Sequence, residues 1–139
     1  MQTFLPYPDI ERSVGCLDVK RLGKQRVECA QILKTLYGQS TGWINHPAVR
    51  MWRGYEPALH LYMSAAIAEW IDRGYKNTMD YDKEYHVKML NKFVRYPPWW
   101  GSFKLHTSHQ SNLLRKDPEW YGGFGWNVPD DLPYFWPVD

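Results

Sequence analysis

The segment DVKRLGKQRVECAQILKTLY, residues 18–37, constrains the fold most because it predicts one long amphipathic helix. Asp18 is a suitable N-cap, strong helix formers follow it, and Gly38 stands just past the end as a helix stop. An apolar stripe recurs at helical spacing and consists of Val27, Ala30, Leu33 and Tyr37. A polar stripe on another side consists of Arg21, Lys24, Glu28 and Gln31. In this polar stripe one carboxylate lies among cations, which would keep it ionised or adjust its pKa for a function. A solvated charged face has the same pattern.

The rest of the chain also predicts helices, since it contains no strand alternation, no internal repeat and no low-complexity run. Besides a short turn and the long helix within 9–37, helices are expected from His46–Pro47, over 57–74 and 80–94, and from Thr107 or Ser108 through Leu114. YPPWWG at 96–101 predicts a loop, and the last 20 or so residues predict irregular structure. We therefore expect an all-α fold, a single compact domain over residues 1–139 with about four to five helices, long aromatic-rich loops and an irregular C-terminal tail.

Charge is unevenly distributed along the chain, although the net charge is only +2. Lys20 to Arg26 carries four cations and no acid, and Lys83 to Lys116 carries seven cations against the single acid Glu84. A surface with this pattern favours an anionic partner that approaches from one side. The alternative is that these charges serve only to keep the protein soluble.

Two cysteines, Cys16 and Cys29, are too few for a disulfide framework and are typical of small core residues in a reducing compartment. No apolar run is long enough to span a membrane, and MQTFLPYPD lacks the charge and apolar block of a signal peptide. These features predict an intracellular, cytoplasmic and soluble protein with no membrane partner.

The familiar signatures of metal and cofactor sites are missing from the sequence. His106 and His109 are three residues apart, but no third ligand stands at metal-site spacing and there is no H-E-x-x-H. There is also no G-x-S-x-G, phosphate-binding glycine loop or dinucleotide fingerprint. We therefore predict neither a metal nor a cofactor.

Four pieces of the chain together indicate a family. They are the Arg/Glu segment of the long helix, His46 opening a helix, and the stretches WRGYEPALHLYMSAAIAEWIDRGY and SHQSNLLRKDPEWYGGFGW. In this order and spacing the chain resembles the pyrimidine-dimer DNA glycosylase family, of the bacteriophage endonuclease V type. The resemblance covers most of the chain.

The resemblance implies base excision through a covalent intermediate. The α-amine of the first residue attacks C1′ of the deoxyribose, expels the base and forms an imine, after which β-elimination cuts the strand. An α-amine suits this step because α-amines titrate near pH 8, roughly two units below lysine side chains. A carboxylate is needed to stabilise the oxocarbenium-like sugar and to move protons.

Carried over to this chain, the catalytic roles fall to Met1, Glu28, Arg26 and His46. The DNA-contacting set comprises Gln2, Arg21, Lys24, Asn45, Arg50, Arg53, His106, His109, Trp120 and Tyr121. Arginines would orient the carboxylate and grip the flanking phosphates, while the aromatic residues would either offset the cost of unstacking the duplex or cover the core. The aromatic candidates are Trp99, Trp100, Trp120, Tyr121 and Trp126. The expected partner is double-stranded DNA containing damaged or modified pyrimidines, bound by a monomer.

The chain departs from the family pattern in two respects. Gln2 is bulky, so we expect Met1 to be retained and to supply the amine itself. The family sets its Arg and Glu side by side, whereas Val27 separates Arg26 from Glu28, and one position turns a helix face by about 100°. Two alternatives therefore stay open, a non-catalytic nucleic-acid-binding domain of the same fold and an N-glycosidase acting on nucleosides.

Overall fold

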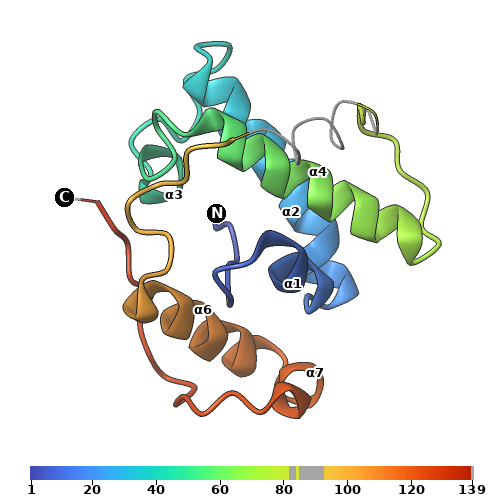
Figure 1. The fold of residues 1–139 in the computed structure, drawn as a ribbon, viewed down its shortest axis with the longest axis vertical. Coiled ribbons are helices and arrows are strands. Elements are labelled where there is room, and N and C mark those ends of the chain that lie inside the picture. The colour runs from blue at the N-terminus through green and yellow to red at the C-terminus, as the bar shows by residue number, and fades with distance from the viewer. Residues whose placement is uncertain (82–83, 85–92, 139) are drawn as a thin grey trace.

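The computed structural model describes residues 1–81, 84 and 93–138, and this part of the chain is helical without strands (Figure 1). Its elements are α1 (Ile10–Gly15), α2 (Val19–Leu36), α3 (Pro47–Arg50), α4 (Glu56–Asp72), α6 (Phe103–Lys116), α7 (Pro118–Tyr121) and a 3₁₀ turn η1 (Gly122–Phe124). The all-α fold predicted from the sequence is confirmed. Most of the helix predicted over 80–94 falls outside the described residues.

The ends of α2 follow the sequence signals, with one change. Gly38 adopts a φ of 77°, and its N–H donates to the carbonyl of Thr35 while the N–H of Gln39 donates to that of Lys34. This pair of bonds is a Schellman motif, in which a glycine takes the left-handed conformation and satisfies the last carbonyls of the helix. Asp18 occupies the N-cap position, but its side chain makes no capping bond because it pairs with Arg21 instead.

The buried face of α2 shares Leu33 with the predicted stripe but otherwise lies elsewhere. Val27 and Tyr37 are 46% and 54% exposed, so they do not belong to the core. The buried face is formed by Leu22, Gln25, Cys29, Ile32 and Leu33. This face recurs at the same helical spacing, but it includes a glutamine, which a search for apolar residues passes over.

Helices α2 and α4 pack closely, and a glycine permits their contact. A Cβ atom added at Gly23 of α2 would lie 3.1 Å from the ring of Trp70 of α4. A larger residue at this position would therefore require the Trp70 ring to shift. Deeper in the same interface, Tyr62 of α4 is fully buried.

Helix α6 begins earlier than the sequence predicted. Ser102 is its N-cap and accepts a hydrogen bond from the N–H of Leu105, so the helix already includes Thr107 and Ser108, which were expected to cap it. Beyond α7 and η1, residues 125–138 have no regular structure, and this tail runs back along the molecule (Figure 1). In the described residues, no helix is long and apolar enough to cross a bilayer.

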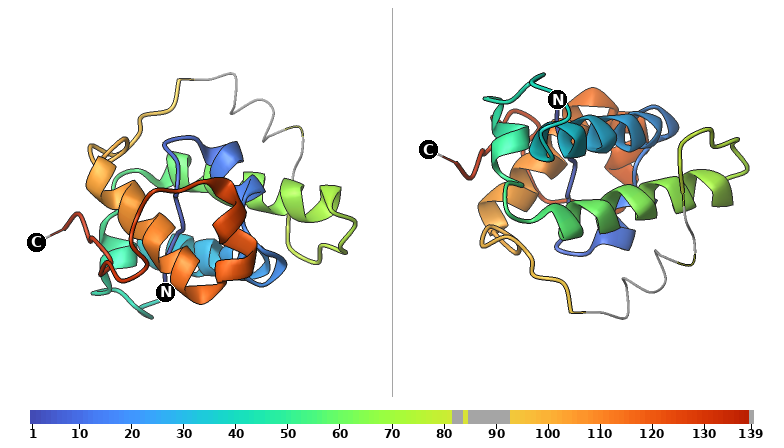
Figure 2. Two further views of the ribbon diagram at one scale, coloured as in Figure 1. Left: turned by 90° about the horizontal axis from the view of Figure 1, so that it is seen from below. Right: turned by 90° about the horizontal axis from the view of Figure 1, so that it is seen from above.

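The N-terminal residues form an extended segment that enters the middle of the helices instead of joining a sheet (Figure 2). Residues 2–6 are buried, yet side chains satisfy the backbone there. Leu5 donates its N–H to Nδ1 of His109 at 2.8 Å, and its carbonyl bonds Nδ1 of His106 at 2.7 Å. The hydroxyl of Tyr62 donates to the carbonyl of Phe4 at 2.6 Å. The two histidines of α6 and one tyrosine of α4 thus make the hydrogen bonds that a neighbouring strand would otherwise provide.

His109 predicts a loss of stability in mild acid. Burial lowers the pKa of His109 from 6.5 to about 3, so between these values the unfolded chain binds a proton that the folded chain does not. The contribution of neutral His109 to the free energy of unfolding is complete above pH 6.5 and is lost as pH falls toward 3. Between pH 7.5 and 5 the wild type should therefore lose about 2 kcal/mol more unfolding free energy than His109→Asn, whose side-chain oxygen replaces the acceptor without titrating. Urea denaturation at several pH values measures this, and parallel curves for the two proteins would contradict it.

Candidate active site

The N-terminus, α2, α6 and the C-terminal tail line one pocket of about 380 Å³, which we call the amine pocket. Its lining comprises Met1, Gln2, Phe4, Lys20, Arg21, Lys24, Gln25, Glu28, Lys116 and Tyr134. Five of the predicted site residues therefore meet here, namely Met1, Gln2, Arg21, Lys24 and Glu28. The one-residue shift between Arg26 and Glu28 does not turn Glu28 away from the terminus.

Glu28 is held against the first residues by two hydrogen bonds to the same oxygen. Its Oε2 accepts the backbone N–H of Gln2 at 3.4 Å and the side-chain amide of Gln25 at 3.1 Å. The N–H of residue 2 is one residue away from the α-amine of Met1. The carboxylate and the chain terminus therefore lie at the same end of the pocket.

Gln25 connects this carboxylate to the buried N-terminal segment. It is 1% exposed, and its Nε2 donates to the carbonyl of Gln2 at 2.9 Å as well as to Glu28. Its Oε1 accepts the N–H of Phe4 and the hydroxyl of Tyr62, each at 2.8 Å. One side-chain amide thus uses its donors and its acceptor to fix the position of the segment relative to Glu28.

The pocket is strongly positive. Lys20, Arg21, Lys24 and Lys116 line it against the single acid Glu28. Desolvation, followed by repulsion from Arg21, Arg115, Lys24 and Lys20, lowers the pKa of Lys116, which shows that these cations act on one another. Clustered cations that repel one another favour an anion of several charges, such as the phosphates of a nucleic acid strand.

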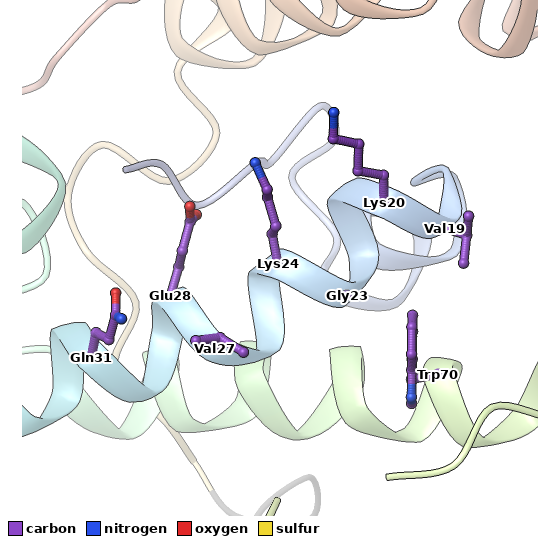
Figure 3. Close-up of a pocket in the computed structure, with 8 residues that line it drawn as sticks. All are labelled: Val19, Lys20, Gly23, Lys24, Val27, Glu28, Gln31 and Trp70. Carbon is purple, nitrogen blue, oxygen red and sulfur yellow. The ribbon is translucent and has the colours of Figure 1, made fainter. Parts of the chain in front are cut away.

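A second hollow of about 560 Å³ adjoins the amine pocket and shares Lys20, Lys24 and Glu28 with it. The three shared side chains leave the same side of α2, while Trp70 approaches from α4 (Figure 3). Val19 and Val27 add apolar surface there, and both are about half exposed. The carboxylate of Glu28 therefore lies on the boundary between a charged pocket and a more apolar groove.

His46 stands close to the terminus and is neutral near pH 7. Its pKa is lowered by desolvation and by the N-terminal ammonium. Its Nδ1 accepts the N–H of Ala48 at 3.0 Å, which caps α3 and leaves the proton of the neutral ring on Nε2. His46 therefore offers an N–H donor on the side of the site where the chain begins.

Asn45, Arg50 and Arg53 are brought together in a separate hollow of about 600 Å³, which we call the arginine pocket. Its remaining lining residues are Ile44, Pro137 and Val138. The three DNA-contacting candidates of this region thus share one surface beside His46.

The other predicted site residues lie away from the amine pocket or inside the fold. Arg26 stacks 4.1 Å above Trp70 and donates to Asn77 at 3.1 Å, on a side of α2 that does not line the pocket. His106 and His109 are buried and hold Leu5, as described above. Tyr121 is completely buried and its hydroxyl bonds Asp18, so its surface is not available to DNA in this structure. Trp120 is 46% exposed, while its indole N–H donates to the carbonyl of Cys16 at 2.7 Å.

The pyrimidine dimer DNA glycosylase family model matches residues 1–94 of the chain, which include the N-terminal segment, Glu28 and His46. The chain belongs to this family. Comparisons with curated proteins and with solved structures gave no match.

Membership in the pyrimidine dimer DNA glycosylase family implies that the substrate of the chain is DNA and supports excision of pyrimidine dimers. The match ends at residue 94, so Lys116 and Tyr134 contribute to the pocket from outside the matched region. Among the residues that the structure describes, no group of three or more His, Cys, Asp or Glu side chains could hold a metal ion.

Several residues in or beside this candidate site escaped the sequence analysis. Gln25 had one available signal, since it is a polar residue at core spacing on the apolar face of α2. Tyr134 and Trp136 come from the C-terminal aromatic run, which bears no spacing relation to the terminus it meets; Trp136 lies 5.5 Å from the ring of His46. Lys20 and Lys116 look like ordinary surface charges in the sequence.

Gln25→Ala should lower the free energy of unfolding by about 3 kcal/mol, because it leaves the buried N–H of Phe4 and carbonyl of Gln2 without a partner. Gln31→Ala provides the control, since Gln31 is an exposed glutamine on the same helix and should change stability by less than about 0.5 kcal/mol. Chemical denaturation of the two variants makes the comparison. Equal effects would mean that the Gln25 network does not hold the segment.

Proposed function

We propose that this protein is a DNA glycosylase with AP-lyase activity that excises damaged or modified pyrimidines, using the α-amine of Met1 as its nucleophile and Glu28 as its acid–base group. The observation that carries the proposal is the bond between Glu28 Oε2 and the N–H of Gln2, in a pocket that Met1 also lines. Family membership supports the glycosylase reaction. The amine mechanism, the lyase step and action as a monomer are proposals.

In the first step the lone pair of the Met1 amine forms a bond to C1′, and the bond from C1′ to the pyrimidine nitrogen breaks. The base departs with that electron pair and takes up a proton. The attached amine then loses a proton, and the bond from C1′ to O4′ breaks, so that O4′ gains a proton and an imine joins C1′ to the chain.

In the second step a base removes a proton from C2′. The electron pair forms a double bond between C2′ and C3′, and the bond from C3′ to the phosphate oxygen breaks with the phosphate as leaving group. Water then hydrolyses the imine and returns the free amine. No oxidant, reductant or cofactor is consumed.

Glu28 suits both steps because Gln25 fixes one of its oxygens beside the terminus. As a carboxylate it stabilises positive charge on the sugar while the base departs, and it can take and return the protons of imine formation and elimination. The surrounding Lys20, Lys24 and Lys116 attract the flanking phosphates. His46 supplies a neutral N–H donor to the sugar or a phosphate.

Glu28→Gln should lower cleavage of dimer-containing duplex by at least about 100-fold while affinity for the duplex changes little, since general acid–base groups contribute roughly that much to rate and the shape of the pocket is kept. Strand cleavage and a binding titration with the same duplex give the two values. Glu119→Gln, the same charge change at an exposed position of α7, is the control. Equal loss of binding and cleavage would make Glu28 a structural residue.

Blocking the N-terminal amine should abolish the covalent intermediate. Borohydride reduction should trap wild-type protein on abasic DNA, and mass spectrometry should place the adduct on Met1. Protein with an acetylated or extended N-terminus should form at least about 100-fold less adduct, because its first nitrogen is no longer nucleophilic or no longer beside Glu28. Full trapping by the blocked protein would point to a lysine such as Lys24, and no trapping by either form would favour a binding domain.

A further inference from the structure

Trp43 is exposed, has a strained backbone, and does not belong to the core cluster or to the residues packed against it. Its side chain is 58% exposed, and its φ of 63° makes it the non-glycine residue with positive φ in the described part of the chain. The left-handed conformation is costly for a bulky residue, and exposing an indole ring forgoes the free energy of its burial. Such outliers persist where a functional arrangement requires them.

The loop that carries Trp43 is held in place by hydrogen bonds. The hydroxyl of Thr35 donates to the carbonyl of Gly42 at 2.7 Å, and the N–H of His46 donates to the carbonyl of Trp43 at 2.9 Å. The indole ring meets the ring of His46 edge to face at 5.7 Å. Trp43 is therefore a fixed projection between a helix end and the N-cap of α3.

This projection stands beside the amine pocket. The N-terminal ammonium is close enough to His46 to contribute to the lowering of its pKa, after desolvation, and Trp43 packs against the same ring. Both views in Figure 2 place the N-terminus next to the loop that joins α2 to α3. Trp43 and the chain terminus are therefore both neighbours of His46.

The surroundings of Trp43 indicate that this ligand is a nucleic acid. The adjoining arginine pocket contains Arg50 and Arg53, and none of its lining residues is acidic. An exposed aromatic ring beside fixed cations matches a base next to its phosphates, because bases stack on aromatic side chains while the cations bind the backbone. Ile44, Pro137 and Val138 also line this pocket, but its charged lining residues are the two arginines, which favours a polyanion as the partner.

We propose that Trp43 acts as a wedge that enters the base stack of duplex DNA beside the pyrimidine being excised, with Arg50 and Arg53 on the adjacent phosphates. The inference rests on the proposed function, since it explains how the amine reaches a C1′ atom that stacked bases and the backbone shield. Inserting a side chain costs the free energy of unstacking one pair of neighbouring bases. Stacking of a base on the indole and contacts to the bent DNA backbone offset this cost. Trp43 is a positioning residue and does not touch the reacting atoms.

The test compares duplex DNA, which must be unstacked, with single-stranded DNA, which need not be. Trp43→Ala should lower excision of a thymine dimer from duplex by about 5- to 100-fold, the effect expected from loss of one stacking partner. Borohydride trapping on a single-stranded abasic oligonucleotide should stay within about two-fold of the wild type, because there is no stack to open. Trp43→Phe should restore most of the duplex activity.

A fluorescent base reports the wedge independently of the chemistry. 2-Aminopurine placed next to the dimer should brighten when wild-type protein binds the duplex and should brighten much less with Trp43→Ala. Phe103→Ala is the matched control, since Phe103 is an 82% exposed aromatic residue on α6 and should leave every signal unchanged.

The outcomes separate the wedge from the proposed function. Equal loss on both substrates, or no loss on the duplex, would overturn the wedge, and so would an unchanged 2-aminopurine signal with Trp43→Ala. If wild-type protein forms no adduct on either duplex or single-stranded abasic DNA, the amine mechanism fails. In that case a 2-aminopurine signal that depends on Trp43 would still support the wedge, and one that does not would overturn it.

Discussion

The structure depends on a buried, extended N-terminal segment whose backbone is satisfied by side chains. A strand placed in a helical core has no neighbouring strand to bond, and each unpaired N–H or carbonyl would cost about 1–3 kcal/mol. Gln25, Tyr62, His106 and His109 supply the missing partners from three different helices. These four side chains therefore determine where the chain begins, as well as how α2, α4 and α6 are arranged around it.

The same network fixes the chemistry of the site. Gln25 bonds both the N-terminal segment and the carboxylate of Glu28, so the terminus and the acid are positioned by a single group. Lysines and one arginine surround this acid in the amine pocket and give it a field that attracts phosphate. A rigid terminus, a fixed carboxylate and a positive surface are the three requirements of the proposed imine mechanism, and all three depend on α2.

The sequence was sufficient for the fold class and for the polar stripe of α2, because helical periodicity and end signals are local. Arg21, Lys24 and Glu28 do share a face, and Gly38 does end the helix. The long-range placements could not be predicted. Whether His106 and His109 face DNA or hold Leu5 depends on where a segment more than a hundred residues away is threaded. The aromatic residues divide in the same way, since Trp99 and Tyr121 are buried whereas Trp43 is exposed, and these residues lie outside the long helices whose periodicity predicts a buried face.

The anchoring of residues 2–6 has a genetic consequence. An extended residue spans about 3.5 Å, so one codon gained or lost ahead of Gln2 would carry the α-amine past Glu28 or leave it short. Replacing the first side chain leaves the main-chain nitrogen in place, however, because every amino acid supplies one. In the proposed mechanism, a change in the number of residues ahead of Gln2 therefore matters more than a change of the first side chain.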